Sequence, residues 1–343
     1  MPESSCSCSS SSSCRCSNLG LSSIPQNLPP SITSLDLRHN QIKTLRQSEL
    51  LRYRNLVELD FEKNRIGIVN CLPNLPRLET LHLQHNMITN IRYGAFANLP
   101  RLRLLNLYHN QITNIQLGIF SNLPRLKVLK LESTKIIDIP PGTISGVPQL
   151  KYLYLNNNQI TKIQSGTYLN LPRLEVLRLN SNNITKIMSG AFRNLPKLRF
   201  LQLTYNQLTA IQSDLFSNLP SLKVLYLSSN QLTVLPPSSY FTFSSISRIG
   251  LSNNPWKCDC SMLDADGVGS LQLENDGVGN LQLDADGVGK LQLDPDGVGN
   301  LQLDADGVRK LQLDADGVGS LMTVQLVVRM RTLSGVLVHD IQS

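Results

Sequence analysis

The sequence predicts an α/β-type solenoid, curved into a horseshoe with a parallel β-sheet on its concave side, followed by a low-complexity C-terminal tail. Three observations predict this fold. A Leu-x-Leu segment recurs along the chain, and an asparagine stands three residues after its second leucine. These asparagines are spaced 24 residues apart almost throughout. After residue 263 the repeat gives way to near-identical decapeptides, which separates a tail from the solenoid.

Each repeat is expected to form one coil. Alternating leucines such as Leu81 and Leu83 indicate a strand with one face in the core. A later aromatic or aliphatic residue completes the core layer at Phe96, Phe120, Ile144, Tyr168, Phe192, Phe216 and Tyr240. The register asparagines are Asn40, Asn64, Asn86, Asn110, Asn158, Asn182, Asn206, Asn230 and Asn254, with Thr134 in the remaining position. Because one coil cannot bury its own apolar face, stability is expected from stacking.

These repeats resemble the extracellular leucine-rich repeat family, in its 24-residue subclass, over about residues 16–260. Relatives of this kind include Slit-like guidance proteins, Toll-like receptors, variable lymphocyte receptors and small leucine-rich proteoglycans. The resemblance implies irregular or short helical segments on the convex side. It also implies an extracellular location and recognition of a protein ligand on the concave face.

The sequence "CRCSNLGLSSIPQNLP" resembles the cysteine-rich N-terminal cap of that family, and we expect the cap to span residues 1–30. The first cysteine of the family motif is absent, and Cys14 is additional. The resemblance implies disulfides Cys6–Cys16 and Cys8–Cys14, and therefore an oxidising compartment. No signal peptide is visible at the start of the chain.

The solenoid is expected to span residues 31–254, in about nine to ten coils, and the start of a C-terminal cap residues 255–263. In "NNPWKCDCSML", Trp256 is expected to cover the last coil, but Cys258 and Cys260 lack the two later cysteines of the family motif. An incomplete gene model is therefore an alternative reading. Cys71, in the shortened 22-residue coil, is expected to be a small buried residue.

Six acidic decapeptides occupy residues 264–320, and a further tail occupies 321–343. Residues 1–260 carry a net charge of +15, and residues 261–320 carry −9. The decapeptides are expected to be disordered or loosely turned, with short Leu-x-Leu strands or calcium-assisted stacking as the alternative. No apolar run reaches the roughly 18 residues of a membrane helix.

No motif for an enzyme is present, since the chain has no phosphate loop, zinc-type Cys-x-x-Cys pair or nucleophile elbow. We therefore expect no catalytic residue, cofactor, metal or nucleic-acid partner. His82, His85 and His109 fall on adjacent coils and could meet on the concave face, where ordinary polar surface is a better interpretation than a zinc site. Asn183 begins an Asn-Ile-Thr glycosylation sequon.

The positions of residues within the repeat unit predict a ligand-binding concave face. The third, fifth, seventh and eighth residues of each Leu-x-x-Leu-x-Leu-x-x-Asn unit should face solvent. The first coils place Asp36, Glu58, Asp60 and Glu62 there. Later coils place the predicted ligand-binding residues Tyr108, Tyr152, Tyr154, Arg178, Phe200, Tyr205 and Tyr226. Tyrosines are frequent interface anchors, whereas the third-position apolar residues could simply pack on one another.

A second candidate surface is basic, and it favours a sulfated glycan as the alternative partner. The residues before the first strand leucine form an outer flank column: Arg77, Arg101, Arg125, Arg173 and Lys197. The residues after it form an inner flank column: Arg103, Lys127, Lys151, Arg199 and Lys223. Like charges about 5 Å apart repel, so a bound polyanion would relieve them, although an ordinary solvated flank is the alternative.

Overall fold

The computed structural model describes residues 6–9, 12–236, 243 and 245–256, together with the backbone of short strands between residues 273 and 342. The chain divides into two units. Unit 1 comprises Met1–Leu198 with Asn218–Pro220, and unit 2 comprises Arg199–Ser217 with Ser221–Ser343.

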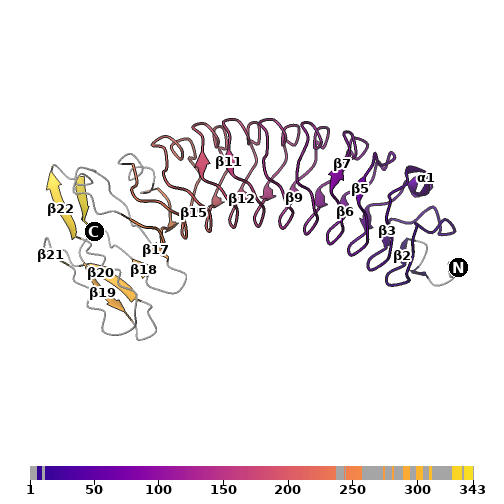
Figure 1. The fold of residues 1–343 in the computed structure, drawn as a ribbon, viewed down its shortest axis with the longest axis horizontal. Coiled ribbons are helices and arrows are strands. Elements are labelled where there is room, and N and C mark those ends of the chain that lie inside the picture. The colour runs from indigo at the N-terminus through magenta and orange to yellow at the C-terminus, as the bar shows by residue number, and fades with distance from the viewer. Residues whose placement is uncertain are drawn as a thin grey trace. The chain divides into compact units, whose positions relative to one another are not determined.

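Unit 1 is a stack of coils, each of which supplies one three-residue strand to a sheet. After the antiparallel pair β1 and β2, all neighbours in the sheet are parallel and in register, so that Leu153 lies opposite Leu129 and Leu177. Figure 1 shows these strands following the inner edge of the arc that unit 1 forms. The strands are β1 Ser7–Ser9, β2 Ser13–Arg15, β3 Ser34–Asp36, β4 Glu58–Asp60, β6 Thr80–His82, β8 Leu104–Asn106, β9 Val128–Lys130, β10 Tyr152–Tyr154 and β12 Val176–Arg178.

The opposite side of unit 1 consists mainly of turns, because the Asn-Leu-Pro segments prevent continued helices. In the described part of the unit it holds one short helix, α1 (Gln47–Leu50). It also holds two parallel strand pairs, which are β5 Ile68–Val69 with β7 Asn90–Ile91 and β11 Lys162–Ile163 with β13 Lys186–Ile187. The predicted solenoid with a parallel concave sheet is therefore confirmed, with almost no helix.

A ladder of buried asparagines joins successive coils. Asn64 is typical: its amide N–H groups donate to the carbonyls of Leu37 (2.9 Å) and Phe61 (3.1 Å), and its Oδ1 accepts the N–H of Ile42 at 3.0 Å. Each asparagine thus satisfies backbone groups of two coils that the turn would otherwise leave buried and unpaired. In unit 2, Asn230 and Asn254 make the same kinds of bond.

Thr134 interrupts this ladder. Its hydroxyl donates to Asn158 Oδ1 at 2.5 Å, but a threonine is too short to bond the preceding coil as an asparagine does. Among the described residues, no hydrogen bond acceptor reaches the Ile112 N–H, which the repeat pattern would assign to an asparagine at position 134. One rung of the ladder is therefore incomplete.

The residue before each ladder position has a positive φ although it is not glycine. These residues are His39, Lys63, His85, His109, Ser133, Asn157, Ser181, Tyr205, Ser229 and Asn253, with φ between 52° and 56°. A left-handed conformation costs a residue other than glycine roughly 1–2 kcal/mol. The ladder bonds on the following residue hold the backbone in this conformation.

The interior of the coils is filled as the sequence predicts. The aromatic or aliphatic residues that complete the core layer of each coil are all buried: Phe96, Phe120, Ile144, Tyr168, Phe192 and Phe216. Rings of successive coils stack, as Phe96 and Phe120 do in unit 1 with centroids 6.3 Å apart. In unit 2, Phe243 packs against Phe216, whereas the expected core residue Tyr240 lies outside the described residues.

The N-terminal cap contains the disulfides Cys6–Cys16 and Cys8–Cys14, the pairing that the family resemblance implied. Strand β2 pairs in parallel with β3, so the cap extends the sheet and covers the first coil. Cys14 and Cys16 are fully buried.

The prediction for Cys71 was wrong. Cys71 is exposed and is the free cysteine of the described residues. It follows Asn64 by seven residues, the position that Tyr93 and Leu117 occupy after their own asparagines, and both of those side chains are also exposed. This position lies on the turn outside the core, so residue size and polarity were a poor guide to burial there.

Unit 2 holds further coils and the tail strands. Its coil strands are β14 Phe200–Gln202, β15 Val224–Tyr226 and β16 Arg248–Gly250, which pair in parallel and in register. The indole N–H of Trp256 donates to the Leu251 carbonyl at 3.0 Å, beside the last coil that it was expected to cover. Cys258 and Cys260 lie outside the described residues.

The tail contains short strands. Two decapeptide segments form an antiparallel pair, β19 with β20, in agreement with the Leu-x-Leu alternative, while the Asp-x-Asp-Gly segments lie outside the described residues. The tail strands are β17 Leu273–Glu274, β18 Asn280–Leu281, β19 Gly289–Leu293, β20 Gly299–Leu303, β21 Arg309–Lys310, β22 Val327–Leu333 and β23 Val336–Gln342. Within the described residues, no helix has the length and apolar character needed to cross a bilayer.

Candidate ligand-binding face

The exposed face of the unit 1 sheet presents the third, fifth and seventh residues of each coil. In the strands of this sheet from β3 to β12 the central leucine is fully buried, while its two neighbours are half-buried or exposed, apart from the buried Asn106. In-register parallel pairing places the same position of successive coils side by side, about 5 Å apart. When the residue type at one repeat position differs between coils, the chemistry of the exposed face therefore changes along the stack.

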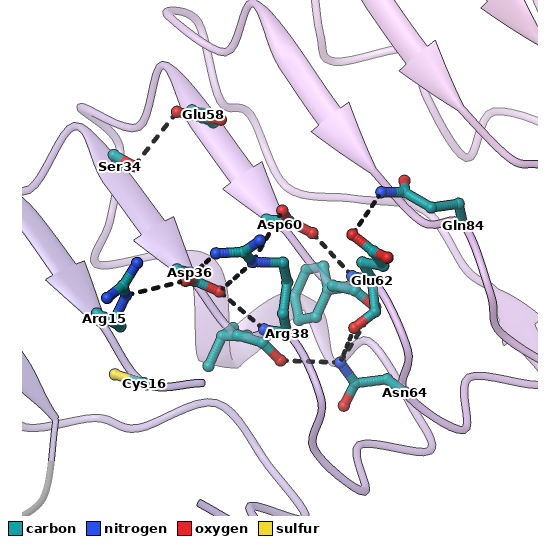
Figure 2. Close-up of polar contacts among 12 residues, drawn as sticks. Arg15, Cys16, Ser34, Asp36, Arg38, Glu58, Asp60, Glu62, Asn64 and Gln84 are labelled. Carbon is teal, nitrogen blue, oxygen red and sulfur yellow. Dashed lines mark hydrogen bonds and ion pairs between the residues drawn. The ribbon is translucent and has the colours of Figure 1, made fainter. Parts of the chain in front are cut away.

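The first coils carry an acidic cluster, defined as Asp36, Glu58, Asp60 and Glu62, and Figure 2 shows how its members are paired. The guanidinium of Arg38 makes two hydrogen bonds to Asp36, at 3.0 and 2.9 Å, and lies 3.5 Å from Asp60. Arg15 of the cap lies 3.6 Å from Asp36. Glu62 accepts a hydrogen bond from Gln84 at 3.1 Å. Asp36 and Asp60 are therefore paired with cations of the protein, whereas Glu58 and Glu62 form no ion pair within the described residues, so the cluster keeps a negative charge.

Burial raises the pKa values of Asp36 and Asp60, and pairing with cations lowers them. Burial raises the pKa of Asp36, but the hydrogen bonds from Arg38 outweigh it and hold that pKa below its usual value. Burial dominates at Asp60, where the pKa is raised. Asp36 is thus held as a carboxylate by its partner, whereas the ionised form of Asp60 is destabilised.

The next coils bring together two of the three histidines that the sequence placed on adjacent coils. The rings of His85 and His109 stack with centroids 4.7 Å apart, and Tyr108 meets the ring of His85 edge-on at 5.1 Å. Burial lowers the pKa of His85, and the nearby His109 lowers it further. His82 lies in β6, and its buried Nδ1 has no hydrogen bond partner. Among the described residues, no group of three or more metal-ligating side chains is assembled.

The middle coils carry the Tyr154 patch, defined as Lys130, Glu132, Tyr152, Tyr154 and Arg178. Lys130 Nζ lies 5.8 Å and Arg178 Cζ lies 5.5 Å from the centre of the Tyr154 ring. Both cations are paired with this one ring because they occupy the same position on the two neighbouring strands. Tyr152 lies half-buried on the same strand, β10. Sequence reasoning named three of these residues as ligand-binding but missed the contribution of Glu132.

In unit 2, Phe200 and Tyr226 pack edge-to-face with centroids 5.7 Å apart. Gly250 makes room for this pair, since a Cβ there would lie 2.7 Å from Cδ1 of Tyr226. Tyr205 is 56% exposed in the left-handed position before Asn206. The predicted aromatic residues of this unit therefore form one pair and one separate side chain.

The flank columns differ from the prediction in one respect. In the inner column, Arg103 forms an ion pair with Glu79 at 2.9 Å, and Lys151 forms one with Glu175 at 2.7 Å. These glutamates occupy the same column on neighbouring coils, so the column is mixed rather than purely basic. The outer column is exposed throughout, at Arg77, Arg101, Arg125, Arg173 and Lys197, as are Lys127, Arg199 and Lys223 of the inner column. The sequon residue Asn183 is also exposed.

Comparison with known proteins identifies the repeats. The profile of a family described as "Leucine rich repeat" matches residues 30–88, 69–112, 100–160, 148–208 and 201–255, which together cover most of the chain. Asporin from Bos taurus is 33% identical over 76 residues, covering 22% of this chain and 20% of asporin. The match thus spans about a fifth of that relative's length.

Two solved structures share the fold. The crystal structure of the TLR13–ssRNA13 complex matches with a TM-score of 0.60 and 30% identity, covering 64% of this chain and 32% of the other. A chain of the octameric complex of Latrophilin 3, Unc5D and FLRT2, in which FLRT2 supplies the leucine-rich repeat part, matches with a TM-score of 0.59 and 26% identity. That match covers 75% of this chain and 85% of the other.

Proposed function

This chain belongs to the leucine-rich repeat family, and we propose that it is an extracellular protein-binding module that holds its ligand on the exposed face of the unit 1 sheet. The observation that carries the proposal is the Tyr154 patch. Tyr152 and Tyr154 stand half-buried on a strand whose backbone is bonded on both sides. Aromatic side chains held by a rigid sheet lose little rotamer freedom on binding, so they are efficient anchors for a protein partner.

Two further observations support an extracellular protein partner. The two disulfides of the cap are characteristic of chains that fold in an oxidising compartment. The structural relatives include an assembly of several proteins. A relative whose structure contains single-stranded RNA is also present, but the acidic cluster on the same face of unit 1 would repel a polyphosphate.

The proposal is tested by screening the oxidised full chain against an array of secreted and cell-surface ectodomains, followed by affinity measurements on variants. Tyr154→Ala is expected to weaken binding of an identified partner about tenfold to a hundredfold, as for an interface anchor. Tyr93→Ala is the matched control, because Tyr93 is 69% exposed on a turn away from the sheet. Equal losses from both variants, or a loss from Tyr93→Ala alone, would place the ligand elsewhere.

A second candidate function is binding of a sulfated glycan by the outer flank column. Its support is that, among the described residues, the side chains of Arg77, Arg101 and Arg125 are exposed and take part in no ion pair with a carboxylate. Charge reversal at Arg101, Arg125 and Lys127 should then abolish retention on heparin while Tyr154→Ala leaves it unchanged. If that triple variant also abolishes protein binding and Tyr154→Ala does not, the glycan function replaces the concave one.

A further inference from the structure

The Tyr154 patch has two cations and one carboxylate, and their burial differs. Arg178 is exposed and Lys130 is half-buried, and both heads lie over the ring of Tyr154. Strands β9 and β12 lie on either side of β10, so the backbones that carry the two cations are about 10 Å apart. This spacing leaves the Tyr154 ring between two positive groups on the open face of the sheet.

Glu132 supplies the negative charge of the patch from the seventh position of its coil. One of its oxygens, Oε2, is buried and has no hydrogen bond partner. Burial raises the pKa of Glu132, while the charges of Lys130 and Arg178 act in the opposite direction. A buried carboxylate of this kind favours cations nearby but cannot itself contact a ligand through its covered oxygen. With two cations against this one carboxylate, the patch carries a net positive charge when all three groups are ionised.

Three side chains interact electrostatically with Glu132. They are Lys130 of its own coil, Tyr154 of the following coil and Arg178 of the next. From the preceding coil, the backbone N–H of His109 donates to the Glu132 carbonyl at 3.1 Å. Lys130 and Arg178 are thus the charged side chains that determine the sign of the patch at neutral pH.

We infer that the Tyr154 patch receives an acidic side chain of the protein partner, with the incoming carboxylate on the open face beside the Tyr154 ring. A carboxylate there would gain a charge-assisted hydrogen bond from Lys130 or from Arg178, and the Tyr154 hydroxyl could donate another. The acidic cluster in the first coils has the opposite sign, so an acidic ligand segment is guided to the middle coils and away from the first ones. This inference rests on the proposed function and adds the chemistry of the partner.

The test uses a fluorescent deca-glutamate peptide and the oxidised full chain, with binding measured by anisotropy at low salt and at about 0.15 M salt. The combined change Lys130→Gln and Arg178→Gln is expected to weaken peptide binding about tenfold. The matched control is Arg101→Gln with Arg125→Gln, which removes the same charge from the outer flank column and is expected to change affinity less than twofold. Glu132→Gln is expected to strengthen binding severalfold, because it removes the one negative charge of the patch.

Three outcomes overturn the inference. The first is a larger loss from the flank control than from the patch variant. The second is weaker binding in Glu132→Gln while its melting temperature is unchanged. The third is a lack of binding by the wild-type chain. If the peptide does not bind but Tyr154→Ala still abolishes ectodomain binding, only this inference fails. If Tyr154→Ala has no effect on ectodomain binding either, the proposed function fails with it.

Discussion

The acidic cluster and the Tyr154 patch occupy the same sheet of unit 1 and are built on the same repeat, yet they use their charges differently. In the acidic cluster, Arg38 bridges Asp36 and Asp60, and Arg15 adds a second contact. In the Tyr154 patch, the cations lie over an aromatic ring, and the carboxylate of Glu132 has a buried oxygen without a hydrogen bond partner. The first arrangement satisfies charges internally and stabilises the first coils. The second leaves cationic groups facing solvent, which suits recognition.

The largest expected effect concerns the cap that supplies Arg15 to the acidic cluster. Replacing Cys6, Cys8, Cys14 and Cys16 by serine should lower the free energy of unfolding by about 2–5 kcal/mol for each lost disulfide. Urea unfolding followed by circular dichroism measures the loss. The first coils should lose amide-exchange protection before the coils of the Tyr154 patch do. Uniform loss across unit 1 would show that the two regions are not energetically distinct.

Arg38→Ala and Arg178→Ala test the comparison directly, since each removes one guanidinium from one region. Arg38→Ala should cost about 1–3 kcal/mol of unfolding free energy, because it leaves the partly buried Asp36 and Asp60 without their shared cation. Arg178→Ala should cost about 0.5 kcal/mol or less, as expected for an exposed side chain. The same urea titration gives both values, and a reversed order would contradict the assignment of structural and binding roles.

Thr134→Asn sharpens the comparison, because Thr134 ends the coil that carries Lys130 and Glu132. An asparagine could accept the Ile112 N–H and restore the missing rung, so we expect a gain of about 1 kcal/mol. The melting temperature should rise, and the affinity of the patch for an acidic peptide should stay the same. A lower melting temperature would mean that the bond between Thr134 and Asn158 is worth more than the restored rung.

The smallest expected effect is on the pH dependence of stability, to which Asp36 and Glu132 contribute with opposite signs. The pKa of Asp36 is lowered, so its stabilisation is present above the unfolded value of about 3.9 and is lost as the pH falls through the lower folded value. The pKa of Glu132 is raised, so its contribution to stability is lost as the pH rises through the folded value. At pH 7, Asp36→Asn should therefore lower stability and Glu132→Gln should raise it, each by about 1 kcal/mol or less.

Thermal melts of these two variants between pH 3 and pH 7 check the signs. Both differences from the wild-type chain should shrink toward pH 3, where the carboxyl groups become protonated in the unfolded chain. The same sign at pH 7 for both variants would contradict the distinction between a paired and an unpaired carboxylate.

The periodic sequence was sufficient to predict the fold, because each core contact recurs every 24 residues. Leu81, Phe96 and Asn86 each represent a column that is buried in the structure wherever it is described. The positions of the strands and the meeting of His85 with His109 also follow from this period. The repeat period predicts which side chains lie side by side, because the parallel strands pair in register.

The chemistry of the candidate site was less predictable, because it depends on side-chain direction between columns. Lys130, Tyr154 and Arg178 share the fifth position, so the repeat period brings them together, whereas only the structure shows that Glu132, in the seventh position, belongs to the same patch. Arg103 and Glu79 share one repeat position on neighbouring coils, so their ion pair follows from the period, but the predicted flank column included only the basic residues. Cys71 was misplaced because its shortened coil hid its equivalence to the exposed Tyr93.

The left-handed residue before each ladder position separates recognition from folding. Histidine, lysine, serine, asparagine and tyrosine all occupy this row with nearly the same φ, so the backbone there does not depend on the side chain. The following buried residue determines the turn, and the residue before it, which is exposed or half-buried, differs in type from coil to coil. A combinatorial library confined to this row should therefore yield new binding specificities from a scaffold that still folds.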